Sequence, residues 1–331
     1  MSKPFKILVI GPSWVGDMVM AQSLFIALKQ QHPDCVIDVL APSWSLQLLQ
    51  RMPEVNQAIA MPFGHGQFDL LGRIRFGQSL QIHQYDQAIV LPNSWKSALI
   101  PFFAKIPKRT GYIGEMRWGF INDARKLDKN LLTMTVQRFV ALADVAEYAF
   151  PKLVISSAQQ QAVIETFSIN QQQKILALCP GAEYGPAKRW PIEHFAAVAS
   201  QIAAKGWQVW LMGSEKDQSV TEEINLQANQ VCRDFAGKTS LAEAVDLMSL
   251  ANVVVSNDSG LMHVAAALDK KLIALYGSSD PGFTPPLHAD ATIINLNLEC
   301  SPCFKRECPL GHTQCLVGIS PDQVIAAIGI D

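Results

Sequence analysis

Three polar loops contain the residue types that hold an anion or remove a proton. The first, Gly11-Pro-Ser-Trp-Val-Gly16-Asp17, follows an apolar run and opens a helical pattern. Backbone N–H groups at such a turn can hold an anion, and Ser13 and Gly16 are candidate contacts. Asp17 either caps the helix or acts as a general base for a hydroxyl group. The loop is neither a Walker A motif nor Gly-x-Gly-x-x-Gly.

The second loop carries two adjacent cations, Lys188 and Arg189, directly before Trp190 and Pro191. Pro191 suits the first turn of a helix. Cations beside a helix start fit a phosphate clamp, because free N–H groups and positive charge meet there. A solvated Lys-Arg pair with Trp190 packed on a sheet fits the same residues, so the pattern alone leaves both interpretations open.

The third loop, Ser-Asn-Asp258-Ser259-Gly260-Leu-Met-His263, gives the strongest pattern. A strand ends in a tight polar turn that opens an apolar helix, and Gly260 lets a ligand approach the backbone closely. The first-turn N–H groups favour a diphosphate there. His263 falls one turn inside and can donate a hydrogen bond to a phosphate or sugar oxygen. The alternative is a helix cap followed by a core helix with a satisfied core histidine.

Two further carboxylates, Glu215 and Asp217, follow another apolar run. Acidic residues after such a strand often bind ribose hydroxyls, and surface carboxylates are the other interpretation. The sequence has no Asp-x-Asp pair. This weakens any mechanism in which a divalent metal holds a diphosphate.

Four of the seven cysteines cluster near the C-terminus, at Cys300, Cys303, Cys308 and Cys315, with His312 among them. Only the first pair has the Cys-x2-Cys spacing of a zinc knuckle. Structural zinc is therefore one interpretation and free reduced thiols are the other. We expect no catalysis from these cysteines, since no base is paired with them in the sequence.

Short apolar runs that alternate with helical patterns must position these loops. The runs indicate strands at residues 6–10, 36–41, 87–91, 174–178, 207–212, 252–256 and 272–276. This alternation predicts an α/β fold of two Rossmann-like, doubly wound domains facing an interdomain cleft. Ligands of such sheets bind at the carboxyl ends of the strands, where all three loops fall.

The bulk composition limits the partners of the chain. Its 331 residues carry a net charge of −2, so no basic excess indicates nucleic acid. No apolar run approaches the roughly 18 residues that cross a bilayer, and the N-terminal run is too short for a signal peptide. We expect a cytoplasmic monomer that can touch a membrane surface peripherally.

The chain resembles the ADP-heptose:lipopolysaccharide heptosyltransferases, glycosyltransferase family nine, over almost its whole length. The motifs that carry the resemblance are, in order, Gly16-Asp17-Met-Val, Pro180-Gly181, Ala187-Lys-Arg-Trp-Pro191, Ser256-Asn-Asp-Ser-Gly-Leu-Met-His263 and Ala274-Leu-Tyr-Gly277. Within the family, the chain looks like heptosyltransferase II, the branch that adds the second inner-core heptose. That closer similarity lies in Gly11-Pro-Ser-Trp-Val-Gly-Asp17, Leu91-Pro-Asn-Ser-Trp-Lys96, Gly181-Ala-Glu-Tyr-Gly-Pro-Ala-Lys-Arg-Trp190 and Phe283-Thr-Pro-Pro286.

The resemblance implies a GT-B-like fold. It implies an N-terminal acceptor-binding domain over residues 1–165, an ADP-sugar-binding domain over 166–320, and a C-terminal helix over 321–331 that packs back on the first domain. It also implies an inverting, metal-independent transfer of L-glycero-D-manno-heptose from ADP-heptose to the first heptose of the lipid A inner core. No cofactor is required for this reaction, and the glycolipid acceptor lies at the inner face of the inner membrane.

The resemblance also assigns roles to the residues in the loops. Asp17 is the general base and Lys188 neutralises the leaving diphosphate. The diphosphate and heptose contacts are Asp258, Ser259, Gly260 and His263. Glu215 or Asp217 lies near the ribose and Thr239 near the adenine. Lys96 and Arg117 are candidate acceptor contacts. Arg117, Arg125 and the basic segment 105–109 either meet acceptor phosphates or are solvated loop charges.

Other functions fit parts of the same pattern. Heptosyltransferase I, another ADP- or UDP-sugar transferase, or a sugar-nucleotide epimerase has the same two-domain plan. A non-catalytic nucleotide-binding module would bind ADP and tolerate the loss of Asp17. An oxidoreductase is excluded because neither half has Gly-x-Gly-x-x-Gly with an acidic residue about 20 positions on.

Overall fold

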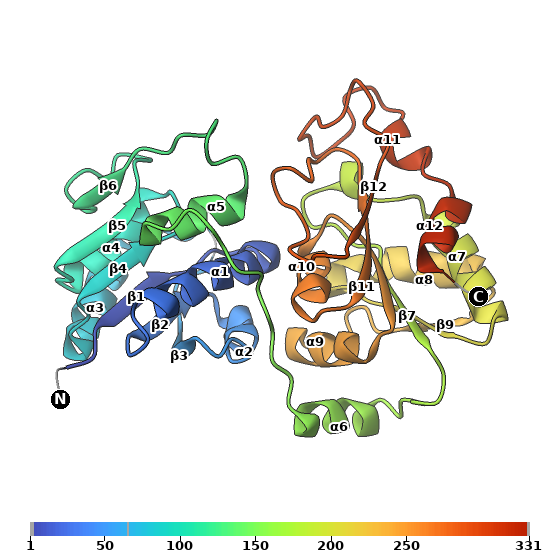
Figure 1. Cartoon of the computed structure of the whole chain (residues 1–331), viewed down its shortest axis with the longest axis horizontal. Coiled ribbons are helices and arrows are strands. Elements are labelled where there is room, and N and C mark those ends of the chain that lie inside the picture. Colours follow the sequence, from blue (N-terminus) through green and yellow to red (C-terminus); the bar gives the residue numbers. More distant parts are fainter. Residues whose placement is uncertain (1–2, 65, 330–331) are drawn as a thin grey trace. The chain divides into compact units, whose positions relative to one another are not determined.

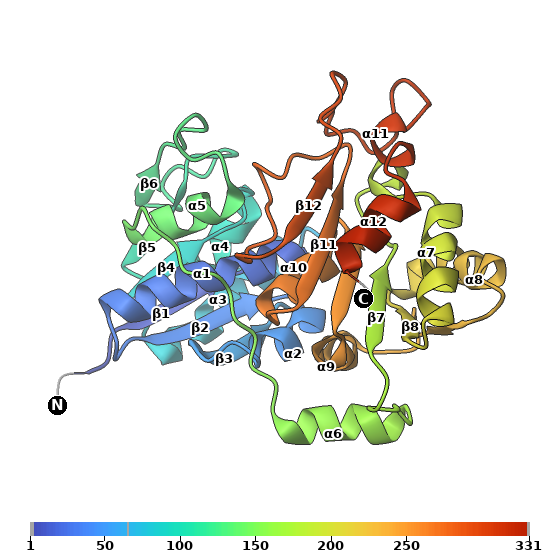
Figure 2. The same ribbon diagram turned by 45° about the vertical axis from the view of Figure 1, so that its right-hand side comes forward.

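Each half of the chain builds a parallel sheet with its first strand near the centre. The computed structural model describes residues 3–64 and 66–329, and the chain divides into two units, residues 1–151 and 152–331. Figures 1 and 2 show the strands and helices of both units. The predicted α/β class and the doubly wound sheets are both present.

The first unit contains strands that alternate with helices. Its strands are β1 (Lys6–Ile10), β2 (Val36–Ala41), β3 (Val55–Ala60), β4 (Gln87–Val90), β5 (Lys108–Tyr112) and β6 (Asp123–Arg125). Its helices are α1 (Val15–Gln31), α2 (Leu46–Leu49), α3 (Leu70–Ser79), α4 (Trp95–Phe103) and α5 (Thr135–Val140).

The second unit repeats this alternation. Its strands are β7 (Ile175–Cys179), β8 (Gln208–Leu211), β9 (Cys232–Asp234), β10 (Val253–Asn257), β11 (Lys271–Tyr276) and β12 (Thr292–Asn295). Its helices are α6 (Ser157–Thr166), α7 (Ile192–Ala204), α8 (Gln218–Gln227), α9 (Leu241–Leu250), α10 (Gly260–Ala267), α11 (Gln314–Val317) and α12 (Pro321–Ile328).

The two sheets have the same strand order. The first runs β3-β2-β1-β4-β5-β6 and the second β12-β11-β10-β7-β8-β9. All pairs in both sheets are parallel, with Ile7 opposite Ile37 on β2 and Val254 opposite Ala177 on β7. The strand order therefore reverses between β1 and β4 and between β7 and β10, and these reversals are where doubly wound folds bind ligands.

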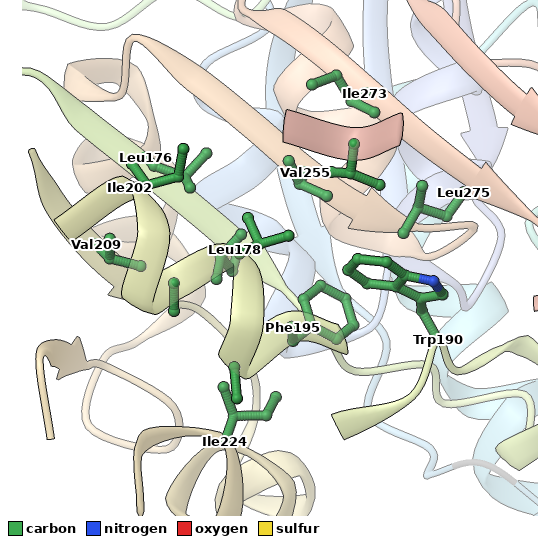
Figure 3. Close-up of a cluster of buried hydrophobic side chains, with 14 of the residues drawn as sticks. Leu176, Leu178, Trp190, Phe195, Ile202, Val209, Ile224, Val255, Ile273 and Leu275 are labelled. Carbon is green, nitrogen blue, oxygen red and sulfur yellow. The ribbon is translucent and has the colours of Figure 1, made fainter. Parts of the chain in front are cut away.

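The central strands are mostly apolar because helices cover both of their faces. In the second unit, alternate residues of β7, β8, β10 and β11 point to the face covered by α7, α8 and α12. Figure 3 shows Trp190 and Phe195 packed against this face beside Leu275. Trp190 and Phe195 lie edge to face with their centroids 4.8 Å apart. The loop that contains Lys188 is thus anchored in the core through Trp190.

The boundary between the units differs from the predicted one. The units divide after residue 151, whereas the sequence predicts a division after residue 165. Helix α6 packs on α9 and buries Val163, and the N–H of Leu153 donates to the carbonyl of Ala267 at 2.9 Å. These contacts attach α6 to the second unit.

The C-terminal helix is grouped with the second unit. Helix α12 packs on α7, and Val324 and Ile328 are buried in the core of the second unit. The packing of this helix on the first domain, which the family resemblance implies, stays a prediction. Among the described residues, no helix combines the length and apolar character that a bilayer crossing requires.

Candidate functional site

The loops after β7 and β10 meet at the strand reversal of the second sheet. Lys188 ends a short 3-10 helix, Pro186–Lys188, in the loop after β7. Its Nζ donates to Oδ2 of Asp258, which directly follows β10, over 2.5 Å. Asp258 is only 5% exposed and Lys188 17% exposed. The pattern-based alternative of a solvated Lys-Arg pair is therefore wrong for Lys188.

One side chain closes the base of the Lys188 loop. The Nδ2 of Asn257 donates to the carbonyl of Pro180 at 2.7 Å, and its Oδ1 accepts from the N–H of Trp190 at 3.1 Å. The Trp190 indole N–H in turn donates to the carbonyl of Ile319 at 2.9 Å. Asn257 is fully buried, so it ties both ends of the loop to β10.

Helix α10 begins beside the Lys188–Asp258 pair. Its N-cap residue is Ser259, whose side chain makes no capping hydrogen bond and whose Oγ lies 3.3 Å from Oγ of Ser256. The first-turn N–H groups, starting at Gly260, supply the positive end of the helix dipole. Asp258, Ser259, Gly260, His263 and Lys188 are thus brought together as the sequence predicts. A mixed polar cluster at a helix start suits an anionic ligand.

His263 is buried without a partner for its Nδ1 among the described residues. The alternative interpretation, a core histidine with satisfied ring nitrogens, is therefore wrong. Burial lowers the pKa of His263 from 6.5 to about 4, while Asp258 acts in the opposite direction and Lys188 adds to the lowering. A neutral imidazole at pH 7 can donate or accept one further hydrogen bond at this nitrogen.

The depressed pKa of His263 predicts a loss of stability in acid. Between pH 6.5 and about 4 the unfolded chain binds a proton at this histidine and the folded chain does not. The contribution of His263 to the free energy of unfolding is therefore fully present above pH 6.5 and is lost as the pH falls toward 4. From pH 7.5 to pH 5, wild type should lose about 2 kcal/mol more unfolding free energy than His263→Gln. Urea unfolding of both proteins at the two pH values measures this difference. Equal losses would show that the imidazole is already paired or solvated.

The carboxylates after β8 separate into two kinds. Oδ2 of Asp217 accepts from the N–H and the Oγ of Ser214, at 2.9 and 2.8 Å, and Asp217 is buried. A Cβ on Gly181 would lie 2.5 Å from the Asp217 carboxylate, so this carboxylate packs directly on the loop after β7. Asp217 therefore has a structural contact, and Glu215 is the exposed carboxylate of the predicted pair.

Thr239 lies on the loop after β9, next to the Glu215 loop. Its Oγ1 donates to the carbonyl of Phe235 at 3.5 Å. A Cβ on Gly237 would lie 2.9 Å from the Cα of Glu215, and Gly237 has a φ of +65° that favours glycine. The predicted ribose and adenine residues thus sit on contacting loops at one end of the second sheet.

The strand reversal of the first sheet carries Asp17 and Lys96. Asp17 is the third residue of α1, in its first turn, and Trp14 occupies the N-cap position. Asp17 is therefore not the N-cap residue itself, but a carboxylate in the first turn also stabilises a helix start, so both interpretations of Asp17 stay open. Ser13 is exposed and Gly16 buried, in the loop between β1 and α1. Lys96 is half-buried in the first turn of α4, which follows β4.

Arg117 does not have the role that the sequence predicts. The residue is buried, and its guanidinium donates to the carbonyl of Tyr112, to the carbonyl of Pro92 at 2.7 Å and to Oδ1 of Asn93 at 3.0 Å. Both acceptor contact and a solvated charge are therefore wrong for Arg117. The hydrogen bonds of its guanidinium join the loops after β4 and β5. Arg125 forms ion pairs with Asp123 and Asp144.

The cysteine cluster shows no arrangement for a metal in this structure. All four thiols are free; Cys315 is buried, Cys303 and Cys308 half-buried and Cys300 exposed. Within residues 3–64 and 66–329, no three His, Cys, Asp or Glu side chains are placed to hold a metal ion. The zinc interpretation therefore gains no support from the geometry.

Comparison with known proteins decides the family. The family model described as glycosyltransferase family 9 (heptosyltransferase) matches residues 73–314. The chain belongs to this family. Lipopolysaccharide heptosyltransferase 2 of Salmonella typhimurium is 49% identical over 97% of this chain and 96% of its own length. The Escherichia coli K12 protein of the same name is 47% identical over the same shares.

The fold of a family 9 member is also confirmed. The solved structure of Escherichia coli ADP-heptose lps heptosyltransferase II superposes with a TM-score of 0.86 at 45% identity, covering 98% of this chain and 97% of that one. A family 9 glycosyl transferase from Veillonella parvula has the same fold at 21% identity, with a TM-score of 0.85. The predicted resemblance and the GT-B-like fold both hold.

Several polar groups of this family 9 chain went unrecognised in the sequence. Asn257 closes the Lys188 loop through its two side-chain hydrogen bonds. The sequence feature that indicates this role is a polar residue directly after a run of apolar strand residues. The Oγ atoms of Ser278 and Ser279 are buried after β11 without partners among the described residues. Buried polar groups without partners are uncommon. His263 follows β10 and the two serines follow the neighbouring strand β11, so all three groups without partners come after adjacent strands.

Proposed function

We propose that this enzyme transfers L-glycero-D-manno-heptose from ADP-heptose to the first heptose of the lipopolysaccharide inner core. The observation that carries the proposal is the buried Lys188–Asp258 pair at the start of α10. Near-full-length relatives named lipopolysaccharide heptosyltransferase 2 support the choice of acceptor class, and the solved Escherichia coli ADP-heptose lps heptosyltransferase II supports the choice of donor.

The donor half of the reaction requires stabilisation of the negative charge on the leaving group. Attack on the anomeric carbon breaks its bond to ADP and leaves negative charge on the diphosphate. The Lys188 ammonium and the N–H groups at the start of α10 are fixed in advance and stabilise that charge. Asp258 holds the ammonium in place. We therefore propose that the leaving group departs without a divalent metal, and that His263 and Ser259 contact the diphosphate or the heptose.

The acceptor half needs a base and a direct displacement. We propose that Asp17 removes the proton from the acceptor hydroxyl as the hydroxyl attacks. A single displacement of this kind inverts the anomeric configuration. The exposure of Ser13 and the first-turn position of Asp17 are consistent with a carboxylate that a sugar can reach. Lys96, in the first turn of α4, would then contact the acceptor.

The acceptor is a glycolipid, and we propose peripheral contact with a membrane. The loop between β5 and β6 exposes Ile113, Met116 and Trp118, the last two by at least 70%. Exposed apolar groups of this kind favour a lipid interface, where tryptophan is enriched. Lys105 is also exposed, whereas Arg109 donates to the carbonyl of Phe120. We propose that the enzyme acts as a monomer at the inner face of the inner membrane.

Mass spectrometry of two acceptors tests this assignment. Purified enzyme is incubated with ADP-heptose and an inner core that carries either no heptose or one heptose. We expect only the one-heptose acceptor to gain a single heptose, with the opposite anomeric configuration to the donor by NMR. Preference for the heptose-free acceptor would overturn the second-heptose assignment and leave the chemistry intact. Modification of neither acceptor, with ADP still bound, would favour an epimerase or a binding module.

A further inference from the structure

A short segment of the cysteine-rich region crosses the carboxyl edge of the second sheet. We define the strap as residues 301–306, which lie between β12 and α11 (Figure 2). At its first end, Oγ of Ser301 donates to the carbonyl of Gly277, and the N–H of Phe304 donates to the carbonyl of Ser278 at 2.7 Å. Both acceptors directly follow β11, so this end of the strap is fixed to the loop after β11.

The other end of the strap is fixed to the Lys188 loop. The carbonyl of Arg306 accepts from the N–H of Ala187 at 3.0 Å, and the carbonyl of Phe304 accepts from the Tyr184 hydroxyl at 2.9 Å. A Cβ on Gly185 would lie 2.5 Å from the Arg306 carbonyl oxygen, and Gly185 has a φ of +157°. Glycine is therefore required for this close approach.

The sheet order shows what the strap crosses. Strand β10 lies between β11 and β7, and the strap joins the loops that follow these two strands. It therefore passes the end of β10, where Asp258 pairs with Lys188. This path brings the main chain of the strap past the candidate diphosphate site.

Arg306 presents a cation there. Its guanidinium carbon lies 5.3 Å from the centroid of the Tyr184 ring, and Nζ of Lys188 lies 5.3 Å from the same centroid. Arg306 is exposed, and no carboxylate in the described part of the chain pairs with it, whereas Lys188 has Asp258. Two cations thus share one ring with one carboxylate. An anion that contacts both cations would neutralise the remaining positive charge.

We propose that Arg306 binds the diphosphate of the nucleotide donor beside Lys188, held in position by the main chain of the strap. The inference rests on the proposed function, because Lys188 marks the diphosphate there. Guanidinium groups bind phosphate through two parallel N–H donors, which a lysine cannot supply. The strap would therefore add a directional contact to the charge that Lys188 provides.

Calorimetric titration with three ligands tests the proposal. We expect Arg306→Ala to raise the Kd for ADP about tenfold, to raise the Kd for AMP less, and to leave adenosine binding unchanged. Arg306→Lys should be intermediate for ADP, since it keeps the charge and loses the paired donors. The matched control is Lys205→Ala, which also removes one positive charge. Lys205 is the C-cap residue of α7, before β8 and so at the amino end of the strands.

The outcomes separate this inference from the proposed function. Unchanged ADP affinity in Arg306→Ala, together with weakened ADP binding in Lys188→Met, would overturn the role of Arg306 alone. Unchanged ADP affinity in both variants would overturn the diphosphate site itself. Equal losses for ADP and adenosine in Arg306→Ala would show a general effect of the strap on the fold, and this also overturns a phosphate contact. A tenfold rise in the Kd for ADP in Arg306→Ala, with the Kd for the acceptor unchanged, would support the proposal and exclude an acceptor phosphate as the ligand of Arg306.

Discussion

Replacing Lys188 by methionine is expected to lower kcat for heptose transfer by about 100-fold or more, which is the effect of removing one preorganised donor from a developing negative charge. Nζ of Lys188 lies 2.5 Å from Oδ2 of Asp258, beside the start of α10. Methionine keeps most of the side-chain volume and removes the charge. Steady-state rates with ADP-heptose and the one-heptose acceptor measure the effect.

The same substitution leaves Asp258 buried without its cation. Removal of one partner from a buried pair costs about 3–5 kcal/mol, so Lys188→Met alone can lose rate through unfolding. The double variant Lys188→Met/Asp258→Asn removes the stranded charge, and we expect it to recover stability in urea unfolding while its rate stays low. Lys205→Met is the charge control. A double variant that regained the wild-type rate would contradict the role of Lys188 in the reaction.

Replacing Asp17 by asparagine is expected to slow transfer by about 10²- to 10⁴-fold, the usual contribution of a general base. Asp17 lies in the first turn of α1 and not in the second unit, which contains the candidate diphosphate residues. We therefore expect the Kd for ADP to stay within about twofold of wild type. Single-turnover rates and ADP titration on the same preparation separate the two effects.

The fold should survive this change. A carboxylate in the first turn of a helix contributes about 0.3–1 kcal/mol through the helix dipole, so Asp17→Asn loses little stability. Asp34→Asn is a suitable control, because Asp34 is exposed just beyond the opposite end of the same helix. An unchanged transfer rate in Asp17→Asn would mean that another group takes the proton. Loss of ADP binding would mean instead that Asp17 belongs to the donor site.

The central strands could be predicted because both of their faces are buried. Strand β1 contains the apolar run Ile-Leu-Val-Ile and β10 the run Val-Val-Val, and their predicted ends differ from the observed ends by no more than one residue. The outer strands could not be predicted. β6 is Asp-Ala-Arg and β9 is Cys-Arg-Asp, three residues each, so neither gives an apolar run or an alternating pattern.

The candidate site could be predicted in part for a similar reason. Asp258, Gly260 and His263 lie within one motif, so a strand-turn-helix unit is enough to place them together. The pairing of Lys188 with Asp258 joins residues 70 positions apart and depends on β7 lying beside β10. Arg117 could not be predicted correctly, because its burial depends on the path of the loop that contains Pro92 and Asn93, and the sequence does not specify that path.

The hydrogen bonds of Asn257 also decide how the Lys188 loop exchanges its amide protons. The N–H of Trp190 is bonded to a buried side chain on β10, at the closed base of the loop. This amide can exchange with solvent only when the loop detaches from β10 or when the whole unit unfolds. Its exchange rate therefore reports the free energy of loop release separately from global stability. A nucleotide that binds only the attached loop must slow that exchange in proportion to its occupancy, and deuterium uptake at one amide then becomes a measure of donor binding.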